Sequence, residues 1–325
     1  MPRAVIADEL GPIENYTLRE FDPGPLQAGQ VRIAVKAAGV SFVDVLTAAG
    51  GYQLKPPVPF IPGSECAGII EAVGKDVTGL SVGQKVTTSG FGGIFADVIN
   101  ATARAVQPMP QGLSYVEASV YSVSSTTSWH ALVDRGQLKA GETLLVLGAG
   151  GATGYAAVQI GKYLGAHVIA SASSEAKREI ALKGGAAAAV TSGAPTWRED
   201  VKAANRGKPV DVVFDPVGGK FTELAFRSLG WNGRHLVVGF PDGIASLPTN
   251  LPLLKSASLV GVNLRHFGEV HPESAHANSD KIFALVGQGL FKPAVAKTFP
   301  LAQFAGAMAE VASGNPAGRI VLVME

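Results

Sequence analysis

The sequence is poor in cysteine and in charge. Cys66 is the one cysteine among 325 residues, so an internal disulfide is excluded and a cytoplasmic setting is expected. Lys and Arg number 27 against 26 Asp and Glu, which leaves a formal net charge of +1, and charged residues make up only 16% of the chain. A chain without a basic excess lacks the electrostatic field that holds nucleic acid or an anionic membrane surface. We expect neither partner.

An uninterrupted apolar span is also lacking. The uncharged run from Thr143 to Gly161 has the length of a membrane span, but it is broken by a cluster of glycines: Gly148, Gly150, Gly151, Gly154 and Gly161. A buried strand followed by a helix explains that composition better than a membrane helix does. The first ten residues, MPRAVIADEL, lack the apolar core of a signal peptide. We therefore expect no membrane segment.

The segment from Thr143 to Ala170 has the pattern of a strand, a glycine turn, a helix and a second strand. Leu144 to Leu147 is an unbroken apolar run, which is typical of a parallel strand covered on both faces. Three glycines then recur at a three-residue spacing: Gly148, Gly151 and Gly154. A helix follows at once, and Val168 to Ala170 is expected to be the next strand.

Such a turn suits the pyrophosphate of a dinucleotide. Free backbone N–H groups and the positive end of the helix dipole converge there, and any Cβ on the turn would hold the phosphate away. The turn lies between a buried strand and a helix, which is the context that this motif requires. A turn that serves only tight packing is the alternative. We assign cofactor binding to Gly148, Gly151, Ala152, Thr153 and Gly154.

The rest of the chain predicts two domains, as its length of 325 residues also does. Up to about residue 120, short β-type runs are separated by Gly and Pro clusters, which indicates a compact β-rich domain. Beyond the glycine turn, further β-type runs recur at Ala187 to Val190, Val210 to Phe214, His235 to Val238 and Ser258 to Val262. With the first two strands they make the six strands of a doubly wound parallel sheet. After about residue 265 the alternation stops, and Ile320 to Met324 is expected as a terminal strand.

These segments resemble the medium-chain dehydrogenase/reductase superfamily, and specifically its zinc-free quinone oxidoreductase branch. The resemblance is carried by PFIPGSECAGIIEAVG, LSVGQKV, the glycine turn with GYAAVQIGKYLGAHVIA, VDVVFDPVGG and AGRIVLV. It implies an α/β chain in which a doubly wound Rossmann domain, 123–264, is inserted into a β-rich GroES-like catalytic domain formed by 1–122 and 265–325. It also implies a homodimer that joins open sheet edges through strands near Ser258 to Val262.

Zinc is not expected. A structural site in the alcohol dehydrogenase relatives needs four thiolates, and this chain has one cysteine. Where those relatives carry catalytic cysteine and histidine ligands, the resemblance places Ser41 and Ser64, so that only Glu65 remains. Two hydroxyls and one carboxylate make a poor zinc site. Without a Lewis acid to stabilise an alkoxide, alcohol oxidation is disfavoured, and hydride delivery to an electrophilic double bond remains.

The end of the second strand indicates which cofactor binds. NAD enzymes place Asp or Glu there to hold the ribose 2′-OH, and the alignment puts Ala172 at that position. Ser173, Ser174 and Lys177 follow, so hydroxyls and a cation are available to a 2′-phosphate, and NADPH is the expected cofactor. The alternative for Lys177 is a solvated helix residue.

The resemblance carries further residues into the cofactor site. Ser192 stands where the branch often has a tyrosine. Loss of that tyrosine weakens the expected binding of the 2′-phosphate. Arg319, in the terminal motif, is a candidate to compensate for it. On the nicotinamide side the resemblance places Thr127, Val217, Gly239 and Phe240.

Two residues of the β-rich domain are candidates for catalysis. Ser41 stands where the branch commonly has asparagine, and a hydroxyl is shorter and cannot offer two donors to substrate or nicotinamide. Tyr52 lies eight residues after Asp44 and matches the tyrosine that related enoyl-thioester reductases use as a proton donor. Packing at the edge of the core is the alternative for Tyr52. No ligand-like spacing of the i, i+4 helix type joins five of the six histidines, which are expected at the surface or in packing: His130, His235, His266, His271 and His276.

These features predict an NADPH-dependent reductase that transfers a hydride to a small-molecule quinone or conjugated carbonyl compound. A second hypothesis within the same branch is an enoyl- or acryloyl-thioester reductase, whose carrier or coenzyme A would require a basic entrance. A third, of another class, is a nucleotide-binding protein with a structural or regulatory use and little turnover. Consumption of NADPH with an enone separates the first two from the third.

Overall fold

The computed structural model describes all 325 residues, which divide into two compact units. The first unit comprises Met1–Val123 and Lys292–Glu325, and the second comprises Ser124–Phe291. The second unit is thus inserted into the first. Its start lies one residue after the boundary at 122 that the sequence suggested, but its end lies after Phe291 and not after Leu264. The assignment of residues 265–291 to the catalytic domain is corrected accordingly.

Residues 265–291 belong to the second unit because the two helices that they form pack on it. Helix α9 (Leu264–Val270) carries Phe267, whose ring stacks on His130 with a centroid distance of 4.1 Å. Helix α10 (Pro272–Gly287) carries Asn278, whose Nδ2 donates to Asp134 Oδ2 at 2.8 Å. The strand–helix alternation ends before the unit does, since these two helices have no strand between them.

The second unit is built on a six-stranded sheet in the order β10-β9-β8-β11-β12-β13, with every neighbouring pair parallel. The strands are β8 (Thr143–Val146), β9 (His167–Ala172), β10 (Ala188–Thr191), β11 (Val210–Asp215), β12 (Leu229–Val237) and β13 (Ser258–Gly261). The chain builds outward from β8 to β10 and then returns to β11 on the other side of β8. The predicted doubly wound sheet is confirmed, and its strand order reverses at β8, where sheets of this kind bind ligands.

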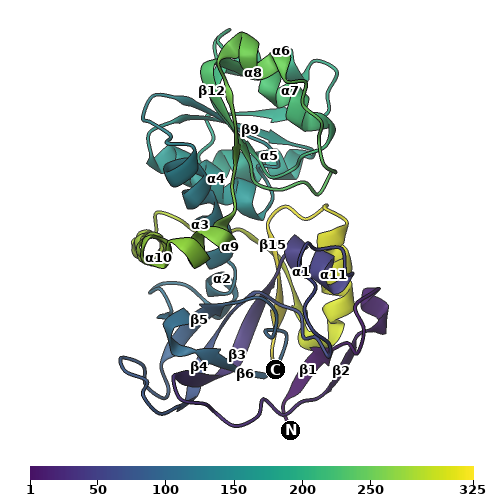
Figure 1. Cartoon of the computed structure of the whole chain (residues 1–325), viewed down its shortest axis with the longest axis vertical. Helices are drawn as coiled ribbons and strands as arrows, with labels where there is room; N and C mark the ends of the chain where they lie inside the picture. The colour runs from purple at the N-terminus through teal and green to yellow at the C-terminus, as the bar shows by residue number, and fades with distance from the viewer. The chain divides into compact units, whose positions relative to one another are not determined.

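Helices connect the strands and cover the sheet (Figure 1). They are α4 (Ala152–Tyr163), α5 (Glu175–Gly184), α6 (Trp197–Ala204), α7 (Lys220–Ser228) and α8 (Asn250–Lys255). Strand β8 is buried along its whole length, as its apolar run predicts. A Cβ on Gly161 of α4 would lie 2.6 Å from Leu144 Cδ2 and 2.9 Å from Val168 Cγ2. Glycine is needed at this position because the helix lies directly against the sheet.

The first unit contains a seven-stranded sheet in the order β14-β15-β3-β4-β5-β7, with β6 paired to β3. Its strands are β3 (Gln30–Val40), β4 (Glu65–Val73), β5 (Lys85–Ser89), β6 (Val98–Thr102), β7 (Val106–Pro108), β14 (Val295–Pro300) and β15 (Arg319–Val323), and β1 (Arg3–Ile6) and β2 (Thr17–Glu20) form a separate pair. Strand β15 is the predicted terminal strand, and it runs antiparallel to β3. The C-terminal segment therefore lies beside N-terminal strands of the same unit (Figure 1, yellow against purple).

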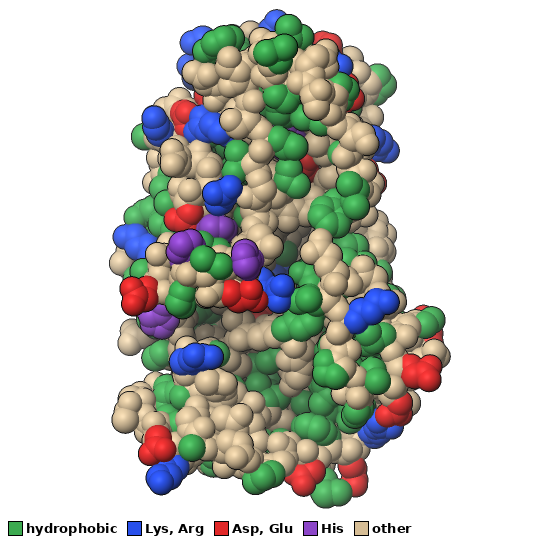
Figure 2. Space-filling model, in the orientation of Figure 1, with side chains coloured by type: hydrophobic (Ala, Val, Ile, Leu, Met, Phe, Trp, Pro, Cys, Tyr) green, Lys and Arg blue, Asp and Glu red, His purple; other side chains and the backbone are tan.

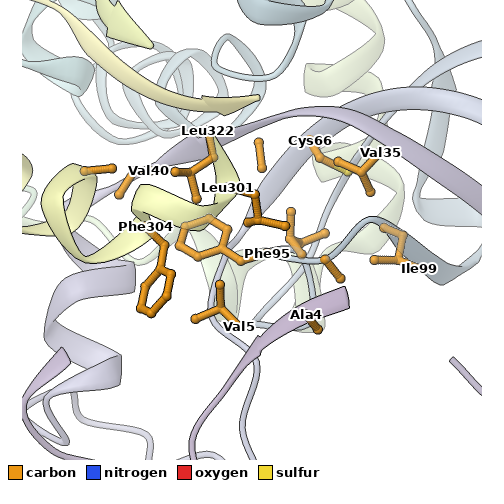
Figure 3. Close-up of a cluster of buried hydrophobic side chains, with 14 of the residues drawn as sticks. Ala4, Val5, Val35, Val40, Cys66, Phe95, Ile99, Leu301, Phe304 and Leu322 are labelled. Carbon is orange, nitrogen blue, oxygen red and sulfur yellow. The ribbon is translucent and has the colours of Figure 1, made fainter. Parts of the chain in front are cut away.

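The core of the first unit is shared between the N-terminal and C-terminal segments. Figure 3 shows Leu301, Phe304 and Leu322 of the C-terminal segment grouped with Val40 and Cys66, and all five are buried. Phe304 begins helix α11 (Phe304–Ala312). Burial raises the pKa of the Cys66 thiol above its ordinary value. Cys66 is thus a small core residue, and residues 292–325 complete a core that the N-terminal segment leaves open.

No helix is both long enough and apolar enough to cross a membrane. The run from Thr143 to Gly161 forms β8, the glycine turn and most of α4. On the face drawn in Figure 2, side chains of both charges are interspersed among hydrophobic and uncharged ones.

Candidate active site

The glycine turn between β8 and α4 presents bare backbone at the start of a helix. Gly148 has a φ of +57°, a conformation that favours glycine. A Cβ on Gly154 would lie 2.2 Å from the carbonyl oxygen of Gly148, so only glycine lets the first turn of α4 lie against the loop. Gly151 is the N-cap of α4, and no side chain caps this helix. Uncapped N–H groups at a helix start are suited to a phosphate.

Lys177 lies against this turn. A Cβ on Gly150 would be 2.5 Å from Lys177 Cβ and 2.9 Å from its Cα, which brings the first turn of α5 next to the glycines. Ser174 is the N-cap of α5, and its Oγ accepts from the N–H of Lys177 at 3.4 Å. Burial lowers the pKa of the Lys177 amine, because desolvation disfavours its charged form. An anion beside the amine would stabilise the charge.

The end of β9 carries no carboxylate. The strand ends at Ala172, whose side chain is buried, and the exposed Ser173 follows it. Ser192 lies next to this strand end, with its Oγ 2.7 Å from Ser171 Oγ. The indole of Trp197 donates to the same Ser171 hydroxyl at 2.8 Å. Ser192 therefore takes part in a hydroxyl network of the second unit, where the family often has a phenol.

On the other side of β8, the loops after β11 and β12 carry the residues predicted for the nicotinamide side. Val217 lies against the glycine turn, because a Cβ on Gly148 would be 3.0 Å from Val217 Cγ2. A Cβ on Gly239 would be 3.3 Å from the carbonyl oxygen of Pro216. Phe240 is 41% exposed. The structure thus brings Val217, Gly239 and Phe240 to the same end of the sheet as the glycine turn.

Thr127 is carried by α3 (Ser122–Trp129). Ser128, which is fully buried, places its Oγ 2.8 Å from the carbonyl oxygen of Thr153 and 2.9 Å from that of Ser124. This contact links α3 to the first turn of α4. The hydroxyl-rich stretch therefore includes a residue, Ser128, that sequence reasoning did not single out and that fixes the helix on which Thr127 lies.

Asp215 and His235 form a second feature that sequence reasoning missed, since His235 was expected at the surface or in packing. Asp215 ends β11, and its carboxylate is buried and paired with His235 Nε2 at 2.9 Å. Burial alone would raise the pKa of this carboxyl, but hydrogen bonds from His235, Gly218 and Thr222 outweigh it and keep the pKa below its ordinary value. The sequence signal was a histidine inside an apolar strand, beside a strand that ends in aspartate.

In the first unit, Ser41 begins helix α1 (Phe42–Ala48) and forms a capping box with Asp44. Ser41 Oγ donates to Asp44 Oδ2 at 2.7 Å, and Ser64 Oγ lies 3.3 Å from the same oxygen. Burial raises the pKa of Asp44 to about 6, although these hydrogen bonds and the charge of Arg319 lower it. Ser41 is therefore a helix cap in this structure, and its contact with a substrate stays a prediction.

Arg319 lies in a buried ion pair, which opposes its expected role at the 2′-phosphate. Its Nη2 donates to Glu65 Oε1 at 2.7 Å, and the two side chains are only 6% and 2% exposed. The other Glu65 oxygen accepts from the N–H of Val123 at 3.1 Å. Withdrawing Arg319 toward a phosphate would leave a buried carboxylate without its counter-charge, which is strongly unfavourable.

The residues at the family's zinc position do not fit a metal. No group of three or more His, Cys, Asp or Glu side chains is placed to hold an ion. The hydroxyls of Ser41 and Ser64 face Asp44, and Glu65 is paired with Arg319. The guanidinium of Arg319, which is paired with Glu65, opposes binding of a cation there.

Tyr52 lies in the loop that follows α1 and is half-buried. Its ring centroid is 5.8 Å from that of Phe91, which is 42% exposed. The two rings form an aromatic pair at the surface of the first unit. This position fits both readings of Tyr52, as a proton donor and as a residue that shapes a binding surface.

Comparisons with known proteins decide the family. Residues 27–111 match the alcohol dehydrogenase GroES-like domain, and residues 152–279 match the family described as zinc-binding dehydrogenase. Quinone oxidoreductase-like protein 2 of Rattus norvegicus is 33% identical over 327 residues, covering 99% of this chain and 92% of that protein. The chain belongs to the quinone oxidoreductase branch of the medium-chain dehydrogenase/reductase superfamily. The predicted combination of a GroES-like and a Rossmann domain is confirmed.

Two solved structures of this superfamily bear on the chemistry. CurK enoyl reductase matches with a TM-score of 0.90 and 26% identity, covering 100% of this chain and 99% of that one. Mycobacterial Rv1454c complexed with NADPH matches with a TM-score of 0.90 and 25% identity, covering 99% of each chain. The second unit fits the family's nicotinamide cofactor, since the glycine turn leaves the N–H groups at the start of α4 without a capping side chain. The chain is therefore an oxidoreductase that uses a nicotinamide cofactor.

Proposed function

We propose that the chain is an NADPH-dependent reductase that transfers a hydride to a quinone or a conjugated carbonyl compound without zinc. The observation that carries the proposal is the position of Lys177 against the glycine turn, combined with Ala172 at the end of β9. Together they offer a cation to a 2′-phosphate and no carboxylate to a 2′-hydroxyl.

Several residues would hold the cofactor in this proposal. The backbone from Gly148 to Gly154 takes the pyrophosphate, and Ser173, Ser174 and Lys177 take the 2′-phosphate. Residues on α3 and after β11 and β12 take the nicotinamide side: Thr127, Val217, Gly239 and Phe240. When bound, the reduced nicotinamide supplies a hydride.

Two further roles fall to residues of the chain itself. One is to oppose binding of a cation at the family's zinc position, and the other is to supply a proton to the reduced substrate. Arg319 holds Glu65 in an ion pair, so the family's zinc position carries a neutralised carboxylate. Reduction of an activated alkene leaves negative charge on the carbonyl side of the product, and the phenol of Tyr52 is the proposed source of the balancing proton. A quinone can take its protons from water, so Tyr52 matters less for that substrate.

An enoyl-thioester is the second candidate substrate, which the similarity to CurK enoyl reductase favours. The quinone reading is supported in turn by the similarity to the Rattus norvegicus protein. Both substrates have an electrophilic acceptor conjugated to a carbonyl group, and the same hydride transfer serves both.

We further propose a homodimer joined through β13. This strand ends the sheet of the second unit, and Leu259 on it is 50% exposed. Leu253 and Leu254 of the neighbouring α8 are 79% and 69% exposed. An open edge with exposed leucines is an aggregation hazard in a monomer, and pairing with a second copy of the chain across a two-fold axis removes it.

The experiment that tests the proposed function is a screen of NADPH oxidation against 1,4-quinones, alkenals and acyl-thioesters, with metal analysis of the same chelator-free preparation. We expect turnover with at least one class and no stoichiometric zinc. Binding of NADPH without turnover on any class would favour a structural or regulatory protein. Tightly held zinc would overturn the metal-free chemistry.

A further inference from the structure

We propose that His235 is a positioning residue for the nicotinamide end of the cofactor site. Acting through Asp215, it holds the shape of the two loops that follow β11 and β12. The inference rests on the proposed function, because it concerns the same cofactor.

His235 lies in the interior of the second unit. It is fully buried on β12, and its ring stacks on Phe226 of α7 with a centroid distance of 5.9 Å. Its Nε2 is 2.9 Å from Asp215 Oδ2, while its Nδ1 has no hydrogen-bond partner. The tautomer that fits carries the proton on Nε2, because a buried N–H without an acceptor at Nδ1 would be unfavourable. His235 therefore donates to Asp215.

Asp215 connects His235 to the loop after β11 through hydrogen bonds. Its Oδ1 accepts from the N–H groups of Val217 at 3.0 Å and Gly218 at 2.8 Å. Its Oδ2 accepts from Thr222 Oγ1 at 2.8 Å as well as from His235. A buried carboxylate needs these donors, since an unsatisfied charged oxygen is costly to desolvate. Removing His235 would leave Thr222 as the one donor to Oδ2 and loosen the carboxylate.

The loop after β11 is in turn joined to the loop after β12. Val217 O accepts from the N–H of Asp242 at 2.9 Å, and the N–H of Gly219 donates to Gly243 O at 2.7 Å. A Cβ on Gly218 would lie 2.8 Å from the Cα of Phe240, so the two backbones are in direct contact. The position of the Asp215 carboxylate therefore affects the conformation of both loops.

The two ends of the cofactor site depend on different strands. Ser174 and Lys177 follow β9, which lies on one side of β8, whereas the loops held by Asp215 follow β11 and β12 on its other side. A change at His235 should therefore disturb the nicotinamide side and spare the 2′-phosphate side. A residue that merely stabilised the unit would affect both sides together.

The test compares two ligands in three variants of the full chain. NADPH spans both sides of the site, whereas adenosine 2′,5′-bisphosphate has no nicotinamide. His235→Leu removes the donor, and we expect its Kd for NADPH to rise about ten- to a hundredfold, with the Kd for the bisphosphate within about twofold of the native value. His235→Gln, whose amide can replace Nε2–H, should recover most of the NADPH affinity. Thr222→Val removes the other donor to Oδ2 from α7 and should repeat the selective loss.

Equal losses for both ligands in His235→Leu would overturn the inference and assign His235 a structural role alone. An unchanged NADPH affinity in His235→Leu and Thr222→Val would also overturn it and would leave the proposed function standing. If His235→Leu does not fold, the Kd values of Thr222→Val for the same two ligands test the inference. Failure of the native protein to bind NADPH would instead overturn the proposed function.

Discussion

Arg319 and Glu65 are 254 positions apart in the sequence, yet their side chains meet at 2.7 Å inside the first unit. Arg319 begins β15 and Glu65 begins β4, and both strands flank β3 in the same sheet. The pair joins the C-terminal segment to the N-terminal one, so it contributes to the fold of the first unit.

Substitution of one partner should therefore be severe. Arg319→Met leaves Glu65 buried without a counter-charge, and we expect the free energy of unfolding to fall by about 3–5 kcal/mol, measured by denaturant titration. The matched control is Arg19→Met, which breaks an exposed pair with Asp8 of the same 2.7 Å distance and should change stability little. Similar effects in the two variants would contradict the buried role of Arg319.

The raised pKa of Asp44 predicts that the free energy of unfolding depends on pH. Burial raises its pKa to about 6 from an ordinary 3.8, so between these values the folded state binds more protons than the unfolded state. The contribution of Asp44 to the free energy of unfolding is then fully present below about pH 4 and is lost as the pH rises through 6.

Asp44→Asn mimics the protonated acid and should not show this loss. Relative to the native protein, the variant should gain about 2–3 kcal/mol between pH 4 and pH 7, measured as unfolding free energy across that range. Asp76→Asn, at an exposed carboxyl, is the control. A native-minus-variant difference that does not change with pH would show that folding does not raise the pKa of Asp44.

Lys177 should set the preference between the two cofactors. Lys177→Ala removes one charge-assisted contact to the 2′-phosphate, a loss of about 1.5–3 kcal/mol, so the Kd for NADPH should rise roughly ten- to a hundredfold while that for NADH stays the same. Lys183→Ala, at the exposed far end of α5, should leave both affinities unchanged. Equal native affinities for NADPH and NADH would refute the assignment.

Tyr52→Phe tests the proton donor. If the phenol supplies the proton, the variant should slow reduction of an enone or enoyl-thioester by roughly 10²–10⁴ in kcat, leave NADPH binding unchanged and affect quinone reduction much less. Phe91→Leu, which removes the ring beside Tyr52 but keeps the phenol, is the control. Small and uniform losses for all substrates in Tyr52→Phe would show that Tyr52 contributes shape only.

The oligomeric state tests the role of β13. We expect light scattering to give a dimer at micromolar concentration, and Leu259→Lys to shift it toward monomer, because a charge on an edge strand opposes pairing. Leu290→Lys is the control, since Leu290 is equally 50% exposed and lies outside the sheet. A native protein that is monomeric at that concentration would refute the proposed interface.

The sequence by itself determined the architecture of the second unit up to β13. Apolar strand runs and the glycine spacing at 148, 151 and 154 are local properties of the chain, and each predicts one conformation. A local signal was also present at Ser41, since Ser-x-x-Asp before a helix is a capping box. Sequence reasoning considered Ser41 for catalysis and did not use that pattern.

The tertiary structure alone decided which polar residues meet. Arg319 was expected at the cofactor and is paired with Glu65. His235 was expected at the surface or in packing and is paired with Asp215. Helices α9 and α10 were expected with the first unit and pack on the second. The periodicity of apolar residues indicates whether a residue faces the interior. The partner of a buried charge depends instead on which strands become neighbours. Strand order is set by contacts between segments far apart in the chain.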